Sequence, residues 1–369
     1  MTQKVLCIIG TRPEAIKMAP VIKALQAEGS INCRVLATAQ HRHMLDQVLD
    51  FFEIVPDMDL DIMRPNQSLA TLSARLLEGL DEVLLAEKPD VVLAQGDTTT
   101  VMAAALACFY QRIPFGHIEA GLRTADLYNP FPEEANRVIV GRLARWHFAP
   151  TQGAMENLLQ EGIATTAITM TGNTVIDALL MAAAKPLALD MQLDESKRLV
   201  LVTSHRRENF GAPFRSICQA LRTIAERNAD VQILYPVHPN PNVKDVAHEI
   251  LGQTSNIMLC EPLDYPQFVA AMKRSYLIIS DSGGVQEEAP ALGKPVLVLR
   301  EETERPEAVE LGVVKLVGAD RETIIGQAQR LLDDPTAYKA MARGVSPYGD
   351  GLAAGRILET LVRHFQTCE

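Results

Sequence analysis

Carboxylates occur in three short motifs of the first half of the chain. Asp97 lies in GDTTT, Glu119 in HIEAGLRT and Glu133 in PEEANR. Each has an ordinary structural explanation, because aspartate caps helices well and acidic residues in the first turn of a helix interact favourably with its dipole. Together they favour a second interpretation, since carboxylates crowded into one site acquire different pKa values and can then divide acid and base roles. The set predicts a site for proton transfer.

A histidine follows an apolar run in the second half. The run Leu199–Thr203 leads into SHRRENFG, which contains His205. A histidine there is able to donate to a substrate oxygen or to exchange a proton near neutral pH. A histidine that only caps the turn is an equally good explanation of this residue.

Two cations flank the first strand–helix turn, GTRPEAIKMAP. Arg12 and Lys17 add positive charge where a helix N-terminus already attracts anions. The motif matches neither GxGxxG nor GxxxxGK[ST], which argues against a dinucleotide site or a P-loop. A solvated turn with surface charges explains the two residues equally well.

The motif DSGGVQEEA supplies a second candidate anion site. Ser282, Gly283 and Gly284 open a helix directly after a strand, which exposes free N–H groups to a phosphate. Glu288, one turn further on, is placed to accept the hydroxyls of a ribose. Arg305 in TERPEA again lies between a strand and a helix. These residues favour binding of a nucleotide over simple helix capping.

Metal and nucleophile chemistry have little support. His117 and Glu119 are two positions apart, and no HxxxH or HExxH spacing occurs. His41 and His43 are too isolated to define a ligand set, and no GxSxG marks a serine nucleophile. We therefore expect neither a metal nor a bound redox cofactor.

Composition bounds the class of protein. The chain has 369 residues, 35 basic and 46 acidic side chains and a net charge of −11, which argues against nucleic acid as a partner. No apolar stretch is long enough to cross a bilayer, and the short apolar run near the N-terminus does not suit a signal peptide. The six cysteines include no CxxC pair. We expect a cytoplasmic protein without disulfides.

Short apolar runs alternate with longer amphipathic segments, which predicts parallel sheets covered by helices on both faces. The predicted strands are Val5–Ile9, Arg34–Thr38, Val91–Gln95, Phe115–Ile118, Leu199–Thr203, Val231–Pro236, Tyr276–Ser280 and Pro295–Arg300. The predicted helices include Ala15–Glu28, Leu69–Glu87, Val101–Tyr110 and Phe214–Arg227.

The alternation of strands and helices is interrupted after about residue 171. We predict an α/β protein with two Rossmann-like domains, 1–171 and 172–351, and a final helix within 352–369 that crosses back to the first domain. Ligands of open parallel sheets bind beyond the carboxyl ends of the strands, so a cleft between the domains is the expected site.

Ten motifs in one order resemble a known family. GTRPEAIKMAP, TAQHR, GDTTT, HIEAGLRT, PEEANR, TGNTVIDAL, HRRENFG, PVHPNP, DSGGVQEEAP and TERPEAV together resemble the bacterial non-hydrolysing UDP-N-acetylglucosamine 2-epimerases. The resemblance runs from about Lys4 to Ile357. It implies a fold of the glycosyltransferase-B type, usually as a homodimer. It also implies reversible conversion of UDP-N-acetylglucosamine to UDP-N-acetylmannosamine, by anti elimination of UDP to 2-acetamidoglucal and re-addition, for surface polysaccharide synthesis.

The resemblance assigns roles by position. It implies catalytic roles for Asp97, Glu119, Glu133 and His205, and UDP contacts for Arg12, Lys17, Ser282, Gly283, Gly284, Glu288 and Arg305. It also implies a site for a second UDP-N-acetylglucosamine as activator at Gln40, His43, Gln67, Glu134, Arg207 and His238. Two alternatives stay open: an epimerase of a related UDP-2,3-diacetamido sugar, and a glycosyltransferase-B transferase.

Overall fold

A computed structural model describes residues 2–38, 42–64 and 66–367, with the side chains of residues 42–44 left aside. The chain divides into two compact units. Unit 1 comprises Met1–Met181 and Tyr348–Glu369, and unit 2 comprises Ala182–Pro347.

The first division falls inside helix α7 (Thr174–Ala184), not before it as the sequence analysis placed it. Residues 172–181 belong to unit 1 because they form hydrogen bonds with the C-terminal segment of the chain. The backbone N–H of Asn173 donates to the carbonyl of Tyr348 at 2.6 Å, and the Asp177 carboxylate accepts from the N–H of Ala354 at 2.9 Å.

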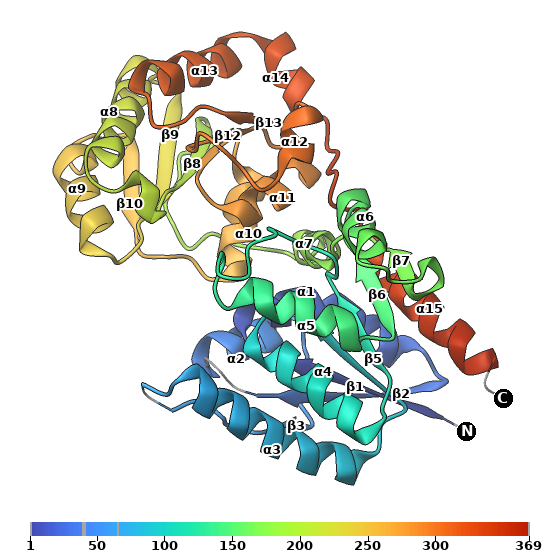
Figure 1. Cartoon of the computed structure of the whole chain (residues 1–369). Helices are drawn as coiled ribbons and strands as arrows, with labels where there is room; N and C mark the ends of the chain where they lie inside the picture. Colours follow the sequence, from blue (N-terminus) through green and yellow to red (C-terminus); the bar gives the residue numbers. More distant parts are fainter. Residues whose placement is uncertain (1, 39–41, 65, 368–369) are drawn as a thin grey trace. The chain divides into compact units, whose positions relative to one another are not determined.

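Unit 1 is built on a seven-stranded sheet in the order β3-β2-β1-β4-β5-β6-β7, with every pair parallel (Figure 1). The strands are β1 (Gln3–Ile9), β2 (Ile31–Ala37), β3 (Met58–Asp59), β4 (Val91–Gln95), β5 (Phe115–Ile118), β6 (Trp146–Ala149) and β7 (Ile168–Met170). The helices are α1 (Arg12–Ala27), α2 (Arg42–Phe51), α3 (Leu69–Glu87), α4 (Thr99–Gln111), α5 (Glu133–Leu143), α6 (Gln152–Gln160), α7 and α15 (Ala353–Thr367), with a short 3₁₀ turn at Thr165–Ala167.

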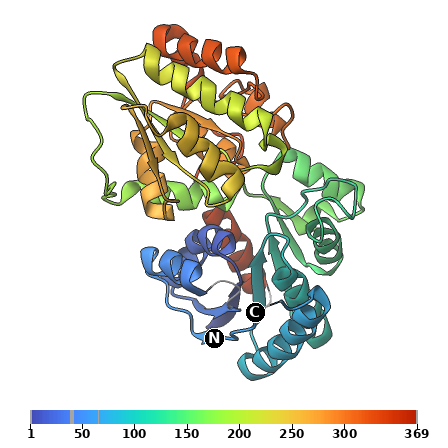
Figure 2. The ribbon, with the colours of Figure 1, turned by 90° about the vertical axis from the view of Figure 1, so that its left-hand side faces the viewer.

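Helices cover the sheet of unit 1 in two groups. Helix α4 packs against α3 and α5, while α1 packs against α2 and α15. Figure 2 shows α15 in red beside the blue N-terminal elements. The final helix of the chain therefore belongs to unit 1, which it completes beside α1 and β7.

Unit 2 has a six-stranded parallel sheet in the order β10-β9-β8-β11-β12-β13. The strands are β8 (Arg198–Thr203), β9 (Val231–Pro236), β10 (Ile257–Cys260), β11 (Leu277–Ser280), β12 (Val296–Val298) and β13 (Val314–Leu316). The helices are α8 (Ala212–Arg227), α9 (Pro241–Leu251), α10 (Tyr265–Arg274), α11 (Gly283–Ala291), α12 (Pro306–Glu310), α13 (Arg321–Asp333) and α14 (Pro335–Met341), with a 3₁₀ turn at Arg207–Asn209.

The central strands of unit 2 are buried on both faces. Val200 and Val202 pack into a core with α8, α9 and α13. Leu199 and Leu201, which alternate with them along β8, are also fully buried. Successive side chains of a strand point to opposite faces, so both faces of this sheet are covered. That burial explains why these strands are continuous apolar runs in the sequence, and it confirms the predicted fold class of two parallel α/β units.

Strand order reverses at one place in each sheet, between β1 and β4 in unit 1 and between β8 and β11 in unit 2. In open parallel sheets ligands bind beyond the carboxyl ends of the strands at this switch point. The motifs GTRPEA, GDTTT, SHRRENFG and DSGGVQEEA directly follow these four strands.

Within the described part of the chain, no helix is both long and apolar enough to span a bilayer.

Candidate active site

Three donors from the described part of unit 1 hold Glu119. It follows β5 with a left-handed backbone, φ 65°, which is uncommon for a residue other than glycine. Its carboxylate pairs with Lys17 Nζ at 2.6 Å and accepts from Asn173 Nδ2 at 2.7 Å and from Gln95 Nε2. Hydrogen bonds to a carboxylate and a nearby cation favour its charged form. These contacts fix the position of the Glu119 carboxylate.

Asp97 lies beyond β4 in a different environment. Burial raises the pKa of Asp97, and the charges of Glu119 and Glu133 raise it further, while Arg137 and Lys17 oppose them. Arg137 Nη1 lies 3.3 Å from the Asp97 carboxylate. A carboxyl group whose pKa is raised by burial and like charge is suited to holding a proton.

Glu133 is the first residue of α5 and is half-buried. Its charge raises the pKa of Asp97, so the structure brings together the three carboxylates that the sequence analysis singled out, although they lie in separate motifs. A cluster of this kind is able to divide acid and base roles.

The neighbouring Glu134 serves the protein's own fold. It is buried and accepts from the backbone N–H groups of Thr124 and Ala125 at 2.9 and 3.1 Å. It also pairs with Arg137 at 2.6 Å. Its carboxylate thereby fixes the loop before α5 and the cation that faces Asp97. A direct contact of Glu134 with an activator stays a prediction.

His117 positions the turn that carries Asp97. Its Nε2 lies 2.7 Å from the carbonyl of Gly96, and the ring is fully buried. Burial lowers the pKa of His117 to about 4, so the ring is neutral at physiological pH and donates from Nε2. Across the described residues, no group of three His, Cys, Asp or Glu side chains is arranged to hold a metal ion.

The turn after β1 is organised around a carboxylate that the sequence analysis did not single out. Glu14 is buried, accepts from the N–H groups of Gly10 and Thr11 at 2.6 and 2.8 Å, and accepts from Thr98 Oγ1 at 2.5 Å. Glu14 thus connects the turn after β1 to the turn after β4.

Arg12 begins α1 and is half-buried, and no described residue forms an ion pair with it.

In unit 2, Arg305 lies directly over the turn before α11. A Cβ atom added to Gly283 would meet Arg305 Nη1 at 2.7 Å, so any other residue at this position would force the guanidinium to move. Arg305 Nε donates to Glu287 at 2.6 Å. Among the described residues, Ser282 makes no side-chain capping bond to α11. An arginine above an uncapped helix N-terminus is suited to binding a phosphate.

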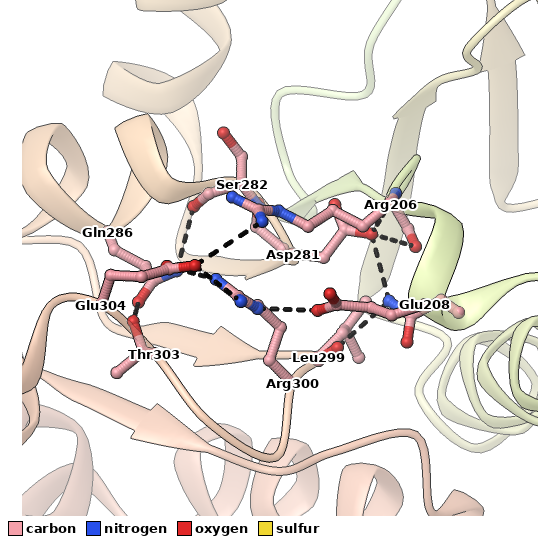
Figure 3. A network of polar contacts seen from close by, with 12 residues as sticks. Arg206, Glu208, Asp281, Ser282, Gln286, Leu299, Arg300, Thr303 and Glu304 are labelled. Carbon is pink, nitrogen blue, oxygen red and sulfur yellow. Dashed lines mark hydrogen bonds and ion pairs between the residues drawn. The ribbon is translucent and has the colours of Figure 1, made fainter. Parts of the chain in front are cut away.

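A network of arginines and glutamates borders this turn (Figure 3). Arg300 forms a bidentate pair with Glu304 at 2.7 and 3.0 Å and also donates to Glu208 at 2.8 Å. The Arg300 hydrogen bonds lower the pKa of Glu304 to about 2, with smaller contributions from backbone donors and Arg206. Glu304 also lies 3.6 Å from Arg305. Glu304 therefore lies within ion-pair distance of three arginines among the described residues, and it shares Arg300 with Glu208.

Glu288 is buried beside the same turn. Burial and the nearby Glu288 raise the pKa of the Tyr265 hydroxyl, which places the two side chains in contact. A Cβ atom added to Gly284 would lie 3.8 Å from the Glu288 carboxylate. The structure thus gathers five of the residues predicted to contact UDP at one end of β11: Ser282, Gly283, Gly284, Glu288 and Arg305. Their shared role stays a prediction.

His205 extends from the loop after β8, and its ring stacks on that of His238 with centroids 5.6 Å apart. Asp281, which precedes Ser282, holds this loop through hydrogen bonds to the backbone of His205 and Arg206, both 2.9 Å. His205 is 44% exposed and is therefore open to a ligand.

The residues expected to bind an activator have different surroundings. Gln40 and the side chain of His43 lie outside the described residues. Gln67 donates to Met63 Sδ at 3.0 Å, whereas Arg207 and His238 are exposed. Their predicted shared role stays a prediction.

Sequence reasoning missed the residues that position the carboxylates. Gln95 and Asn173 both donate to Glu119, and Asn173 is 54 positions away along the chain. Gln95 at least stands beside GDTTT, but no local spacing links Asn173 to Glu119. Asp281 stands in a motif that the sequence analysis used, yet only the folded chain shows which loop it holds.

The fold and site define a class: a Rossmann-like α/β protein with a carboxylate cluster in one unit and, in the other, an arginine beside a helix N-terminus that has no side-chain cap. A family model described as UDP-N-acetylglucosamine 2-epimerase matches residues 23–362. The UDP-N-acetylglucosamine 2-epimerase of Escherichia coli strain K12 is 54% identical over 368 residues, covering 97% of this chain and 98% of that protein. The chain therefore belongs to the UDP-N-acetylglucosamine 2-epimerase family.

Solved structures agree with this assignment. The UDP-GlcNAc 2-epimerase of Neisseria meningitidis bound to UDP-GlcNAc is 49% identical with a TM-score of 0.87, covering 98% of this chain and 100% of that chain. The glycotransferase of kitacinnamycin is 14% identical with a TM-score of 0.65, covering 97% and 98% of the two chains. The second similarity shows the fold alone, and it agrees with the predicted glycosyltransferase-B-like class.

Proposed function

We propose that this chain interconverts UDP-N-acetylglucosamine and UDP-N-acetylmannosamine by moving the proton at C2 of the sugar. The observation that carries the proposal is the raised pKa of Asp97 beside Glu119 and Glu133, at the switch point of a member of this family. A raised pKa shifts a carboxyl group toward the range in which it exchanges protons most effectively.

The chemistry requires elimination and re-addition. A base takes the C2 proton, the C2–H electron pair becomes the C1=C2 double bond, and the bond from C1 to the UDP oxygen breaks. Re-addition of UDP with proton delivery to the opposite face of C2 inverts that centre. Proton exchange on two faces requires two groups, and we assign these roles to the cluster of Asp97, Glu119 and Glu133.

We assign the binding of the departing UDP to residues whose positive charges and N–H groups can contact phosphate oxygens. Arg305 with Ser282, Gly283 and Gly284 forms such a set in unit 2, and Arg12 and Lys17 lie on α1 in unit 1. Preorganised donors of this kind stabilise charge that develops as a diphosphate departs. Glu288 is assigned to the ribose and His205 to the diphosphate.

Lys17 requires one refinement of its predicted role. Its Nζ pairs with Glu119 at 2.6 Å, so Lys17 belongs to the carboxylate cluster as well as to the residues that we assign to the diphosphate. A cation shared in this way would stabilise the Glu119 anion before UDP departs and the diphosphate afterwards.

One NMR experiment tests the function. The protein is incubated in D₂O with UDP-N-acetylglucosamine and no acceptor, and C2 of the sugar is followed. We expect UDP-N-acetylmannosamine with deuterium at C2 in both epimers. Release of free N-acetylmannosamine and UDP would replace the proposal with a hydrolysing epimerase.

Two further outcomes address the alternatives left open by the sequence. Lack of reaction with UDP-N-acetylglucosamine combined with turnover of a UDP-2,3-diacetamido sugar would change the substrate. A protein inert until an acceptor is added would be a transferase.

Three predictions from the sequence complete the proposal: a homodimer, a cytoplasmic location and activation by a second UDP-N-acetylglucosamine. Analytical ultracentrifugation tests the first, and fractionation of the source cells tests the second. A hyperbolic rate curve, with no requirement for UDP-N-acetylglucosamine to start the reverse reaction, would exclude the third.

A further inference from the structure

The two oxygens of the Asp281 carboxylate are used unequally. Asp281 is completely buried at the end of β11 (Figure 3). Its Oδ2 accepts four hydrogen bonds, from Ser204 Oγ at 3.0 Å, His205 N at 2.9 Å, Arg206 N at 2.9 Å and Asn209 Nδ2 at 3.1 Å. Its Oδ1 accepts none from the described residues.

A buried carboxylate oxygen without a donor is unfavourable, because it has lost water and gained nothing in return. Among the described basic side chains, His205 lies within ion-pair distance, with its Nδ1 atom 3.5 Å from Asp281 Oδ1. Among the described residues, neither lysine nor arginine forms an ion pair with Asp281. A proton on His205 Nδ1 is therefore what this oxygen requires.

The stacked ring of His238 restricts the movement of His205. The two rings are 14° from parallel with centroids 5.6 Å apart. The Nδ1 atom of His238 accepts from the N–H of Asn240 at 3.2 Å, so the neutral ring of His238 carries its proton on Nε2. His238 thus has a fixed tautomer of its own and supports His205 from one side.

We propose that Asp281 is a positioning residue that holds His205 in the Nδ1–H tautomer and directs its Nε2 atom to the ligand. A neutral histidine has one donor and one acceptor nitrogen, so a proton on Nδ1 leaves a lone pair on Nε2. When the ring is protonated, Nε2–H donates to a phosphate oxygen while the Asp281 carboxylate stabilises the imidazolium. The contact of His205 with substrate rests on the proposed function, whereas its tautomer does not.

The substitution Asp281→Asn tests the proposal directly. The amide oxygen is able to accept the hydrogen bonds that Oδ2 now accepts, and the amide nitrogen then faces His205 Nδ1. Because an amide nitrogen only donates, Nδ1 must become the acceptor and the proton must move to Nε2. A wrong tautomer of this kind lowers kcat by about 10⁴-fold in the serine protease triad.

The readout is the ¹⁵N spectrum of histidine-labelled protein at about pH 8.5, where an ordinary imidazole is neutral. The His205→Gln spectrum identifies the His205 signals among those of the eight histidines. We expect Nδ1–H in the wild type and Nε2–H in Asp281→Asn. With UDP-N-acetylglucosamine, we expect kcat to fall by roughly 10²-fold or more at a nearly unchanged KM.

Ser204→Ala is the matched control. It removes one donor to Oδ2 and leaves the Oδ1 side of Asp281 intact, so His205 should keep its Nδ1–H tautomer. If the effect of Asp281 were only to hold the loop, both variants would leave the tautomer unchanged.

The Asp281 proposal is overturned if wild-type His205 carries its proton on Nε2, or if Asp281→Asn keeps it on Nδ1. Should Asp281→Asn lose its cooperative thermal transition, the wild-type spectrum decides alone. The wild type could instead be inert toward UDP-N-acetylglucosamine while His205 still changes from Nδ1–H in the wild type to Nε2–H in Asp281→Asn. That result would remove the epimerase proposal and support the positioning role.

Discussion

The two units share one fold but surround a carboxylate in each with opposite electrostatics. At the switch point of unit 1, burial and like charge raise the pKa of Asp97. Beyond the switch point of unit 2, after β12, Arg300 lowers the pKa of Glu304 to about 2. Both are carboxylates in loops that follow parallel strands. The sheet decides where a side chain lies, and its neighbours decide whether it holds a proton or a charge.

The largest effect should follow from removing one of the three carboxylates to which we assign proton exchange, Asp97 in unit 1. We expect Asp97→Asn to lower kcat about 10³-fold, within the range for losing a general acid–base residue. Affinity for UDP should change by roughly twofold at most, because we assign UDP mainly to unit 2. Isothermal titration with UDP and the D₂O assay measure both.

Asp50→Asn, at an exposed position of α2, is the control and should leave both values unchanged. If Asp97→Asn retained more than about a tenth of the activity, the contrast between the units would lose its functional meaning.

The next effect concerns the donors that position Glu119. Gln95→Leu removes one hydrogen bond to this carboxylate. A hydrogen bond to a charged group contributes about 1.5–3 kcal/mol, so we expect kcat to fall by roughly ten- to a hundredfold. Gln111→Leu is the matched control, since Gln111 Nε2 also donates to a carboxylate, that of Asp81, between α3 and α4. Equal kinetics of the two variants would argue against a positioning role for Gln95.

A smaller effect is expected at the anion site of unit 2. Gly283→Ala adds a Cβ that would lie 2.7 Å from Arg305 Nη1, so the guanidinium must move away from the turn. We expect UDP affinity to fall by roughly tenfold, or about 1.4 kcal/mol, because part of that displacement is absorbed by a flexible side chain. Gly326→Ala, at an open position of α13, should leave UDP affinity unchanged. Unchanged binding in Gly283→Ala would remove Arg305 from the proposed site.

The smallest effects are opposite changes in thermal stability. The native pKa of Asp97 is raised, so its charge opposes folding at neutral pH, and this penalty disappears as pH falls through that pKa toward the ordinary aspartate value near 3.9. Asp97→Asn should therefore raise Tm at pH 7 and lose that gain in acid. Calorimetry across pH measures this change.

Glu304→Gln should change stability in the other direction. The lowered pKa of Glu304 means that its charge stabilises the fold above the ordinary glutamate value near 4.3, and this contribution is lost as pH falls through about 2. The side chain is 56% exposed, so solvent screening keeps the effect small, and we expect Tm to fall by about 1 °C at pH 7. Shifts of the same sign in both variants would contradict the comparison.

The sequence predicted the central strands better than the edge strands. The run Val91–Gln95 coincides with β4 and Leu69–Glu87 with α3. The strands that were not among the predicted runs are β3, β6, β7, β10 and β13, which lie toward the edges of the two sheets. Edge strands are short here, and β10 is only half-buried along its length. Because an apolar run reflects burial on both faces, its signal weakens where burial ends.

The sequence likewise predicted some features of the candidate site and missed others. Residue types in motifs after strands were sufficient to select Asp97, Glu119 and Glu133, since parallel strands bring their carboxyl ends to one edge. Which donors hold them was not predictable, because Asn173 reaches Glu119 only through the packing of α7 within unit 1.

By itself, the sequence determined the fold class, the family and the identity of the candidate residues, because burial, helix period and motif order are properties of the linear chain. Only the tertiary structure decided the state of those residues. Lys17, expected at the diphosphate, is paired with Glu119, Glu134 is bonded to its own loop, and the last helix completes unit 1. These outcomes depend on distances of a few ångströms between segments far apart in the chain. Charge pairing and desolvation act over just such distances, and no local pattern encodes them.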